Sequence, residues 1–66
     1  MRLKAVIEAL LKFMPRSEAE AMTQAELFEK AVIPTKTTGQ RALRHLLETG
    51  QIQRIGWKGN RFRYFL

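Results

Sequence analysis

Basic side chains that could bind phosphate are concentrated in the second half of this 66-residue chain. Residues 1–34 carry five basic and five acidic side chains, whereas residues 35–66 carry seven basic side chains and a single acid, Glu48. The whole net charge of +6 therefore belongs to the second half. Such a one-sided excess indicates an anionic partner, and nucleic acid is the first to consider. The seven basic residues are Lys36, Arg41, Arg44, Arg54, Lys58, Arg61 and Arg63.

Residue types that catalysis or metal binding requires are scarce. The chain has no cysteine, no aspartate and one histidine, His45. No glycine-rich phosphate loop follows a predicted strand, and no carboxylates are paired with a plausible base. We therefore expect no enzymatic activity, no metal site and no cofactor, and we interpret His45 as a surface residue.

Length and composition predict one domain that spans residues 1–66. Apolar residues make up 45% of the chain, which is enough for a modest core and too many for a disordered tail. The longest apolar stretch, residues 5–14, contains Glu8 and Lys12 and is too short to cross a bilayer. We therefore expect a folded protein without a membrane span.

Two helices are predicted in the first half of the chain. Apolar residues recur every three or four positions over about residues 2–14, which is typical of an amphipathic helix, and Pro15 ends it. Thr23 and Glu26 have the spacing of a capping box and are flanked by a hydrophobic staple. A second, shorter helix is therefore expected at about residues 24–32.

A third helix is predicted at about residues 36–49. Thr35 is a good N-cap, and Gly50 suits the left-handed turn that ends many helices. Gly39 lies on the expected buried side, where it either allows a neighbouring helix to approach closely or is tolerated without a packing role. The expected buried side consists of Gly39, Ala42, Leu43 and Leu46.

Residues 52–66 predict a β-hairpin, because isoleucine and aromatic residues alternate with arginine around Gly59 and Asn60. A two-residue turn of type II′ at these positions would pair Lys58 with Arg61. Strand alternation would then separate an apolar face from a cationic face. The apolar face would carry Ile55, Trp57, Phe62 and Tyr64, and the cationic face would carry Arg54, Lys58, Arg61 and Arg63.

The expected cationic face has two interpretations. Like charges opposite each other destabilise a hairpin, so a strip without acidic neighbours favours phosphate as its partner. Alternatively, the charges keep an exposed strand edge from aggregating. The aromatic residues Trp57 and Phe62 have three interpretations, because they could extend the core, stack on each other or form an apolar tip.

The order of three helices and a hairpin resembles the winged helix-turn-helix family, and the resemblance extends over nearly the whole chain. Gly39 and Gln51 depart from it, since the family usually has aliphatic residues there. The resemblance implies an α+β fold, mainly α, with a three-helix helix-turn-helix core followed by a C-terminal β-hairpin wing. The residues of the strongest matching stretch are Thr38, Arg41, Leu43, Leu46, Gly50 and Ile52.

The same resemblance implies that the third helix lies in the major groove of duplex DNA and that the wing rests on the backbone or minor groove. The residue types of the third helix by themselves also predict a DNA-binding surface, because its outward side chains are of types that contact base edges or phosphates. Trp57 and Asn60 are candidate contacts at the wing tip. The predicted DNA-binding residues are Thr35, Lys36, Thr37, Thr38, Gln40, Arg41, Arg44, Arg54, Lys58, Arg61 and Arg63.

We therefore expect a duplex DNA-binding domain of a transcription regulator or a replication-type protein. Two other functions stay open: a protein-interaction module that uses the wing aromatics, and binding of single-stranded nucleic acid by stacking on them. The expected partner is double-stranded DNA, with a second copy of the chain or further domains of a parent protein as additional candidates. No membrane or small-molecule partner is expected. The protein would act in the cytoplasm with the nucleoid, or in the nucleus of a eukaryotic cell.

Overall fold

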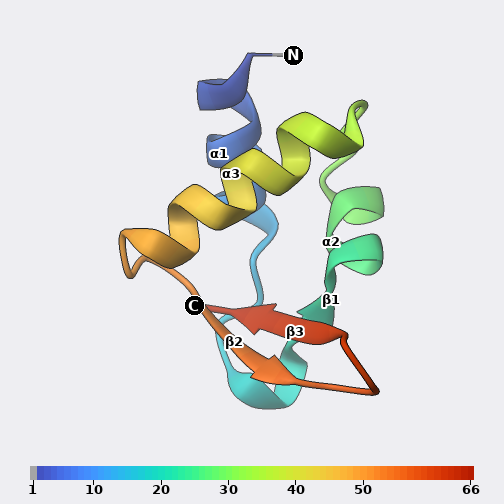
Figure 1. The fold of residues 1–66 in the computed structure, drawn as a ribbon. Coiled ribbons are helices and arrows are strands. Elements are labelled where there is room, and N and C mark those ends of the chain that lie inside the picture. Colours follow the sequence, from blue (N-terminus) through green and yellow to red (C-terminus); the bar gives the residue numbers. More distant parts are fainter. Residues whose placement is uncertain (1) are drawn as a thin grey trace.

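A computed structural model describes residues 2–66. Helices α1, α2 and α3 lie together above a small antiparallel sheet, and a short 3₁₀ turn, η1, lies below it (Figure 1). The expected α+β class, mainly helical and ending in a β-hairpin, is confirmed. Within residues 2–66, no helix has the length and apolar character needed to cross a membrane. The elements are α1 (Leu3–Phe13), η1 (Glu18–Glu20), β1 (Met22–Thr23), α2 (Gln24–Lys30), α3 (Lys36–Glu48), β2 (Gln53–Gly56) and β3 (Phe62–Phe65).

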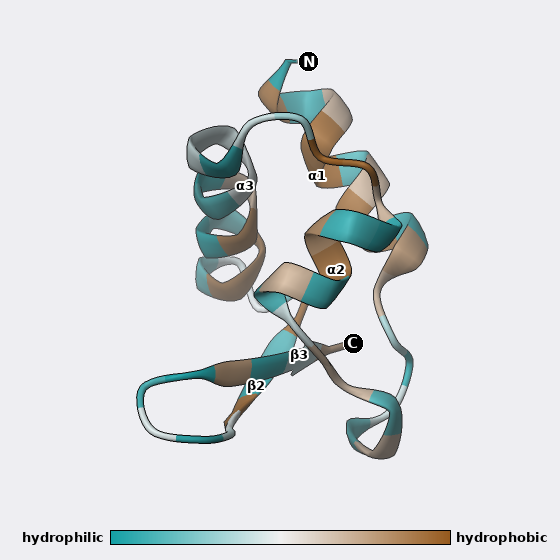
Figure 2. Ribbon diagram, turned by 90° about the vertical axis from the view of Figure 1, so that its right-hand side faces the viewer, coloured by the Kyte–Doolittle hydropathy of each residue, from teal (hydrophilic) through white to brown (hydrophobic). Residues whose placement is uncertain are grey.

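The core lies between the three helices, where α3 crosses α1 (Figure 1). The hydrophobic side of each helix is turned toward the others, and the hydrophilic side faces outward (Figure 2). Val6, Leu10, Leu27 and Leu46 are fully buried, and burial of such side chains stabilises the fold by roughly 1.5 to 3 kcal/mol each. The core therefore determines which side of α3 is left exposed.

The start of α2 is stabilised by the predicted capping box. The backbone N–H of Glu26 donates to Thr23 Oγ1 at 3.3 Å, and the backbone N–H of Thr23 donates to Glu26 Oε1 at 3.1 Å. Two N–H groups without partners inside the helix are satisfied in this way. The capping box thus fixes the point at which the chain leaves β1 and enters α2.

Helices α2 and α3 end in the same way, with a residue in the left-handed region after the last turn. Gly50 has a φ of +74°, and the N–H groups of Gly50 and Gln51 donate to carbonyls of α3 at 3.1 and 3.0 Å. After α2, Val32 has a φ of +54°, and the N–H groups of Val32 and Ile33 donate to α2 at 3.2 and 3.0 Å. Both are Schellman motifs. The left-handed Val32 explains why α2 ends at Lys30, two residues before the expected boundary.

Gly39 is a point of close approach between α3 and the α2 region. A Cβ atom at this position would lie 2.7 Å from ring carbons of Phe28 and 3.0 Å from Cγ2 of Ile33. The space that a side chain would need is therefore filled by the Phe28 ring. The close-packing interpretation of Gly39 is therefore confirmed.

The hairpin turn lies where the sequence predicts it, but the register of its strands is shifted by one residue. Gly59 has a φ of +58°, and the N–H of Arg61 donates to Lys58 O at 3.0 Å. The carbonyl of Arg61 accepts from the N–H of Trp57 at 2.9 Å. Trp57 and Lys58 thus both lie opposite Arg61, which is the arrangement of a β-bulge.

The expected division of the hairpin into an apolar and a cationic face is therefore wrong. A shift of one residue moves the side chains of one strand to the other face of the sheet. Arg54 pairs with Tyr64 and Gly56 pairs with Phe62. The expected pairing of Lys58 with Arg61 would instead continue along the strands to pair Gly56 with Arg63 and Arg54 with Phe65. Each face consequently combines arginine with aromatic residues. One face carries Arg54, Phe62 and Tyr64, and the other carries Ile55, Trp57 and Arg63.

A third strand, β1, joins the hairpin in the order β1-β3-β2. Met22 pairs with Tyr64 and Thr23 pairs with Arg63. The sequence gives no signal for this strand, because two residues are too few for an alternating pattern. Through β1 the hairpin is attached directly to the start of α2, and its strand β2 is left as an edge of the sheet.

The left-handed backbone of Val32 leads to a stability prediction. A β-branched residue in this region costs about 1 to 2 kcal/mol, and the Val32 side chain is 76% exposed, so its removal sacrifices little burial. We expect Val32→Gly to raise the free energy of unfolding by about 1 kcal/mol in urea denaturation, after the greater chain entropy of glycine is included. The matched substitution Gly50→Val should lower it by about 1 to 2 kcal/mol. Destabilisation by Val32→Gly would contradict this account.

The capping box leads to a prediction of pH dependence. Hydrogen bonds from the backbone and the hydroxyl of Thr23 lower the pKa of Glu26 below its ordinary value of 4.5, and the positive charge of Arg63 lowers the pKa further. A carboxyl group whose pKa is lowered by folding stabilises the fold above its ordinary pKa and loses that contribution as the pH falls. Glu26→Gln should therefore lower the Tm at pH 7, and the difference from wild type should shrink below about pH 4.5. Glu29→Gln, on the same helix, is the matched control, and a pH-independent difference for Glu26→Gln would show that its charge contributes nothing.

Candidate nucleic-acid interface

The exposed side of α3 carries most of the residues that the sequence predicts for DNA binding. The buried side is the expected one, with Gly39, Ala42, Leu43 and Leu46 facing the core. Thr38 is half-buried, so it lies at the border of the exposed side rather than on it. The exposed members are Thr35, Lys36, Thr37, Gln40, Arg41 and Arg44.

An open groove of about 780 Å³ lies between α3 and the β2–β3 hairpin, which we call the wing. Arg44 and Gln40 line it from α3, and Arg54 lines it from β2. Arg54 is ten positions from Arg44 and fourteen from Gln40 in the sequence, so the tertiary fold brings the three side chains to one groove. Tyr64 also lines the groove, and only 7% of its surface is exposed. The groove therefore has a rigid aromatic residue and two arginines in its lining.

Arg54 is oriented by an aromatic neighbour. Its guanidinium carbon lies 4.1 Å from the ring centroid of Phe62, a distance typical of a stacked cation–π pair. Phe62 in turn lies opposite Gly56, which has no side chain to compete for this position. The stack holds the charge of Arg54 on the hairpin face that is turned toward the groove.

Arg63 lies on the other face of the hairpin and is held by the protein itself. Its Nε donates to the carbonyl oxygen of Ala21 at 2.8 Å, and its guanidinium carbon lies 4.5 Å from the ring centroid of Trp57. The side chain is half-buried. The geometry thus gives Arg63 a structural role, in which it joins β3 to the segment before β1. Arg63 was expected on the same cationic face as Arg54, but the β-bulge places the two residues on opposite faces.

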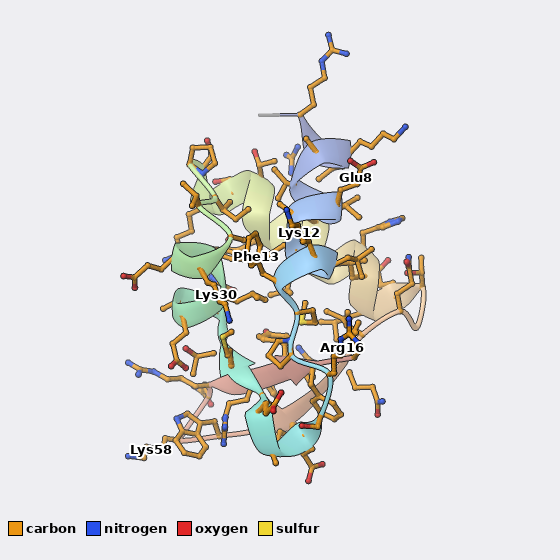
Figure 3. The ribbon with its side chains drawn as sticks, turned by 180° about the vertical axis from the view of Figure 1, so that it is seen from behind. Glu8, Lys12, Phe13, Arg16, Lys30 and Lys58 are labelled. Carbon is orange, nitrogen blue, oxygen red and sulfur yellow. The ribbon has the colours of Figure 1, made fainter. Side chains whose placement is uncertain are left out.

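The remaining wing residues of the predicted site lie at the tip of the hairpin. Lys58, Asn60 and Arg61 are exposed, and Lys58 extends away from the helices (Figure 3). Trp57 and Phe62 were expected on one face, where they could stack on each other, but they lie on opposite faces and each is stacked with an arginine. The tip is therefore positively charged on both sides.

Five residues of the groove were not predicted as part of the site: Gln24, Leu43, Leu47, Glu48 and Tyr64. Gln24 and Tyr64 are the two of them that come from outside α3. Gln24 is the first residue of α2, and Tyr64 was expected only as part of an apolar face. The N-cap at Thr23 could have pointed to Gln24, because the first turn of a capped helix is exposed at one end. No signal in the sequence places either residue beside Arg54.

Within residues 2–66, no group of three or more histidine, cysteine, aspartate or glutamate side chains could hold a metal ion. The groove contains one acidic side chain, Glu48, at the end of α3. Its other polar lining residues are arginine, glutamine and tyrosine, which donate hydrogen bonds. Such a lining is suited to an anion that accepts hydrogen bonds.

The chain was compared with models of protein families, with curated proteins and with solved structures, and none of the three comparisons found a match.

Proposed function

We propose that this protein binds duplex DNA, with the exposed side of α3 in the major groove and the β2–β3 hairpin on the phosphate backbone. The observation that carries the proposal is the convergence of Arg44 from α3 and Arg54 from β2 on one open groove. Lys36 and Arg41 extend the same positive surface along α3. A surface of this kind complements the backbone of nucleic acid.

The size and chemistry of α3 suit the major groove. The helix has 13 residues and is therefore about 20 Å long. The major groove of B-DNA admits a single α-helix, and its base edges offer acceptors to arginine and a donor–acceptor pair to glutamine. Arg41 and Gln40 are exposed on α3 and are the residues we assign to base contacts.

The wing lies on the same side of the molecule as this surface. The hairpin tip and the hydrophilic side of α3 project in the same direction (Figure 2). A duplex seated on α3 would therefore meet the Arg54 face of the hairpin. Because Phe62 holds the guanidinium in place, less side-chain entropy is lost when Arg54 contacts a phosphate.

The salt dependence of binding tests the groove directly. Arg44→Gln and Arg54→Gln should each weaken binding of a labelled duplex by about tenfold in fluorescence anisotropy and reduce the slope of log K against log salt by about 0.9. Glu48→Gln, which removes the acid from the same groove, should strengthen binding. Arg16→Gln is the charge-matched control, because Arg16 lies on the side away from α3 (Figure 3). Equal effects of Arg16→Gln and Arg54→Gln would refute the assigned groove.

The two parts of the interface should differ in what they recognise. Gln40→Ala and Arg41→Ala should change the sequences recovered when the protein selects DNA from a random pool, because these side chains can reach base edges. Arg54→Gln should weaken binding to all sequences alike and leave the recovered motif unchanged. If all three variants weaken every sequence equally, the binding is non-specific.

A further inference from the structure

The hairpin face turned away from the groove carries an exposed aromatic residue that the proposed duplex binding does not use. Trp57 is 47% exposed, although tryptophan is a large apolar residue. It shares its face with Arg63, whereas Arg54 and Phe62 occupy the face turned toward α3. A duplex seated on α3 and Arg54 therefore has the wing between itself and the indole ring.

The indole ring is held in place from one side. The guanidinium of Arg63 lies 4.5 Å from its ring centroid, and that guanidinium is itself anchored by the 2.8 Å hydrogen bond from Nε to Ala21 O. Trp57 is thus backed by a group that is fixed to the rest of the fold. A ring held in this way keeps an exposed surface and loses little entropy when a second planar group stacks on it.

The charge around Trp57 indicates the kind of group that would stack there. Lys58 Nζ lies 5.7 Å from the ring centroid, and Arg61, exposed in the same turn, lies at the hairpin tip on the side of Arg54 and Phe62. Residues 49–66 contain no acidic side chain. An aromatic ring among cations binds a nucleobase together with its phosphate, because the base stacks and the backbone is neutralised. An apolar protein segment would have to bury these charges without compensation.

We propose that Trp57 stacks on an unpaired nucleotide of a single strand that extends from the bound duplex. Inside a duplex each base is already stacked on both sides, and a terminal pair offers only its outer face, whereas an unpaired base beyond the duplex can turn a free face to the indole ring. A strand that leaves a duplex seated on α3 reaches Trp57 by passing the tip of the hairpin, where Lys58 and Arg61 neutralise its phosphates. The direction of the strand rests on the proposed duplex binding, whereas stacking on Trp57 does not.

Trp57 is the single tryptophan of the chain, so its fluorescence reports the proposed contact directly. The protein is titrated with a blunt duplex, with the same duplex carrying a short single-stranded extension at its 3′ or 5′ end, and with the single strand alone. We expect the extended duplex and the single strand to quench the emission, and the blunt duplex to leave it nearly unchanged. Free N-acetyltryptophanamide corrects for absorption by the DNA.

Affinities of matched variants complete the test. The extended duplex should bind about tenfold more tightly than the blunt one, the gain expected from one base–aromatic stack. Trp57→Ala should remove this gain without weakening the blunt duplex, and Trp57→Phe should retain most of it. Circular dichroism and the unchanged blunt-duplex affinity show that the variants are folded.

Each outcome decides a separate point. Equal affinities for the two duplexes, or equal fluorescence changes with both, overturn the stacking proposal while duplex binding stands. Quenching by the single strand without any binding of the blunt duplex refutes the duplex proposal and supports the stacking site. The absence of quenching with all three nucleic acids overturns the stacking site whatever the duplex does.

Discussion

The positions of all wing side chains depend on one β-bulge at Trp57 and Lys58. The bulge places two residues opposite Arg61 and thereby shifts the pairing of β2 with β3 by one residue. Because side chains alternate along a strand, the shift decides which face receives each arginine. With the bulge, Arg54 lies toward α3 and Arg63 lies on the opposite face. Without it, both arginines would lie on one strip, without the separate aromatic partners that now hold them.

Two cation–π pairs, Arg54 with Phe62 and Arg63 with Trp57, stabilise the hairpin despite its positive charge. Like charges on neighbouring strands repel each other, and a hairpin with a cationic turn needs compensation. Phe62 under Arg54 and Trp57 under Arg63 supply it, since a cation over an aromatic face is attracted by the ring. The bond from Arg63 to Ala21 adds a link between the wing and the segment before β1. The hairpin thus has two chemically different faces, each with an arginine stacked on an aromatic ring.

The placement of α3 has a different physical basis, which is the packing of the helices. Phe28 fills the space beside Gly39, so α3 approaches the α2 region more closely than any side chain at that position would allow. The connection between the helices is short enough to need a left-handed residue, and the chain has Val32 there at some cost in strain. The buried contact of α3 with α1 and α2 offsets this strain and leaves the polar side of α3 facing the wing.

The sequence by itself determined the three helices, the buried side of α3 and the position of the hairpin turn. Periodicity located the three helices, the capping pair Thr23 and Glu26 located the start of α2, and Gly59 located the turn, because each of these signals acts over a few residues. Strand β1, the bulge and the groove residues Gln24 and Tyr64 escaped it. Strand β1 and the placement of Gln24 and Tyr64 depend on contacts between distant segments, such as Arg63 with Ala21, 42 positions apart, which leave no local pattern. The total charge of the wing was therefore a property of the sequence, whereas its division between two faces was decided by tertiary packing, because a single extra residue in a ladder reverses the direction of side chains.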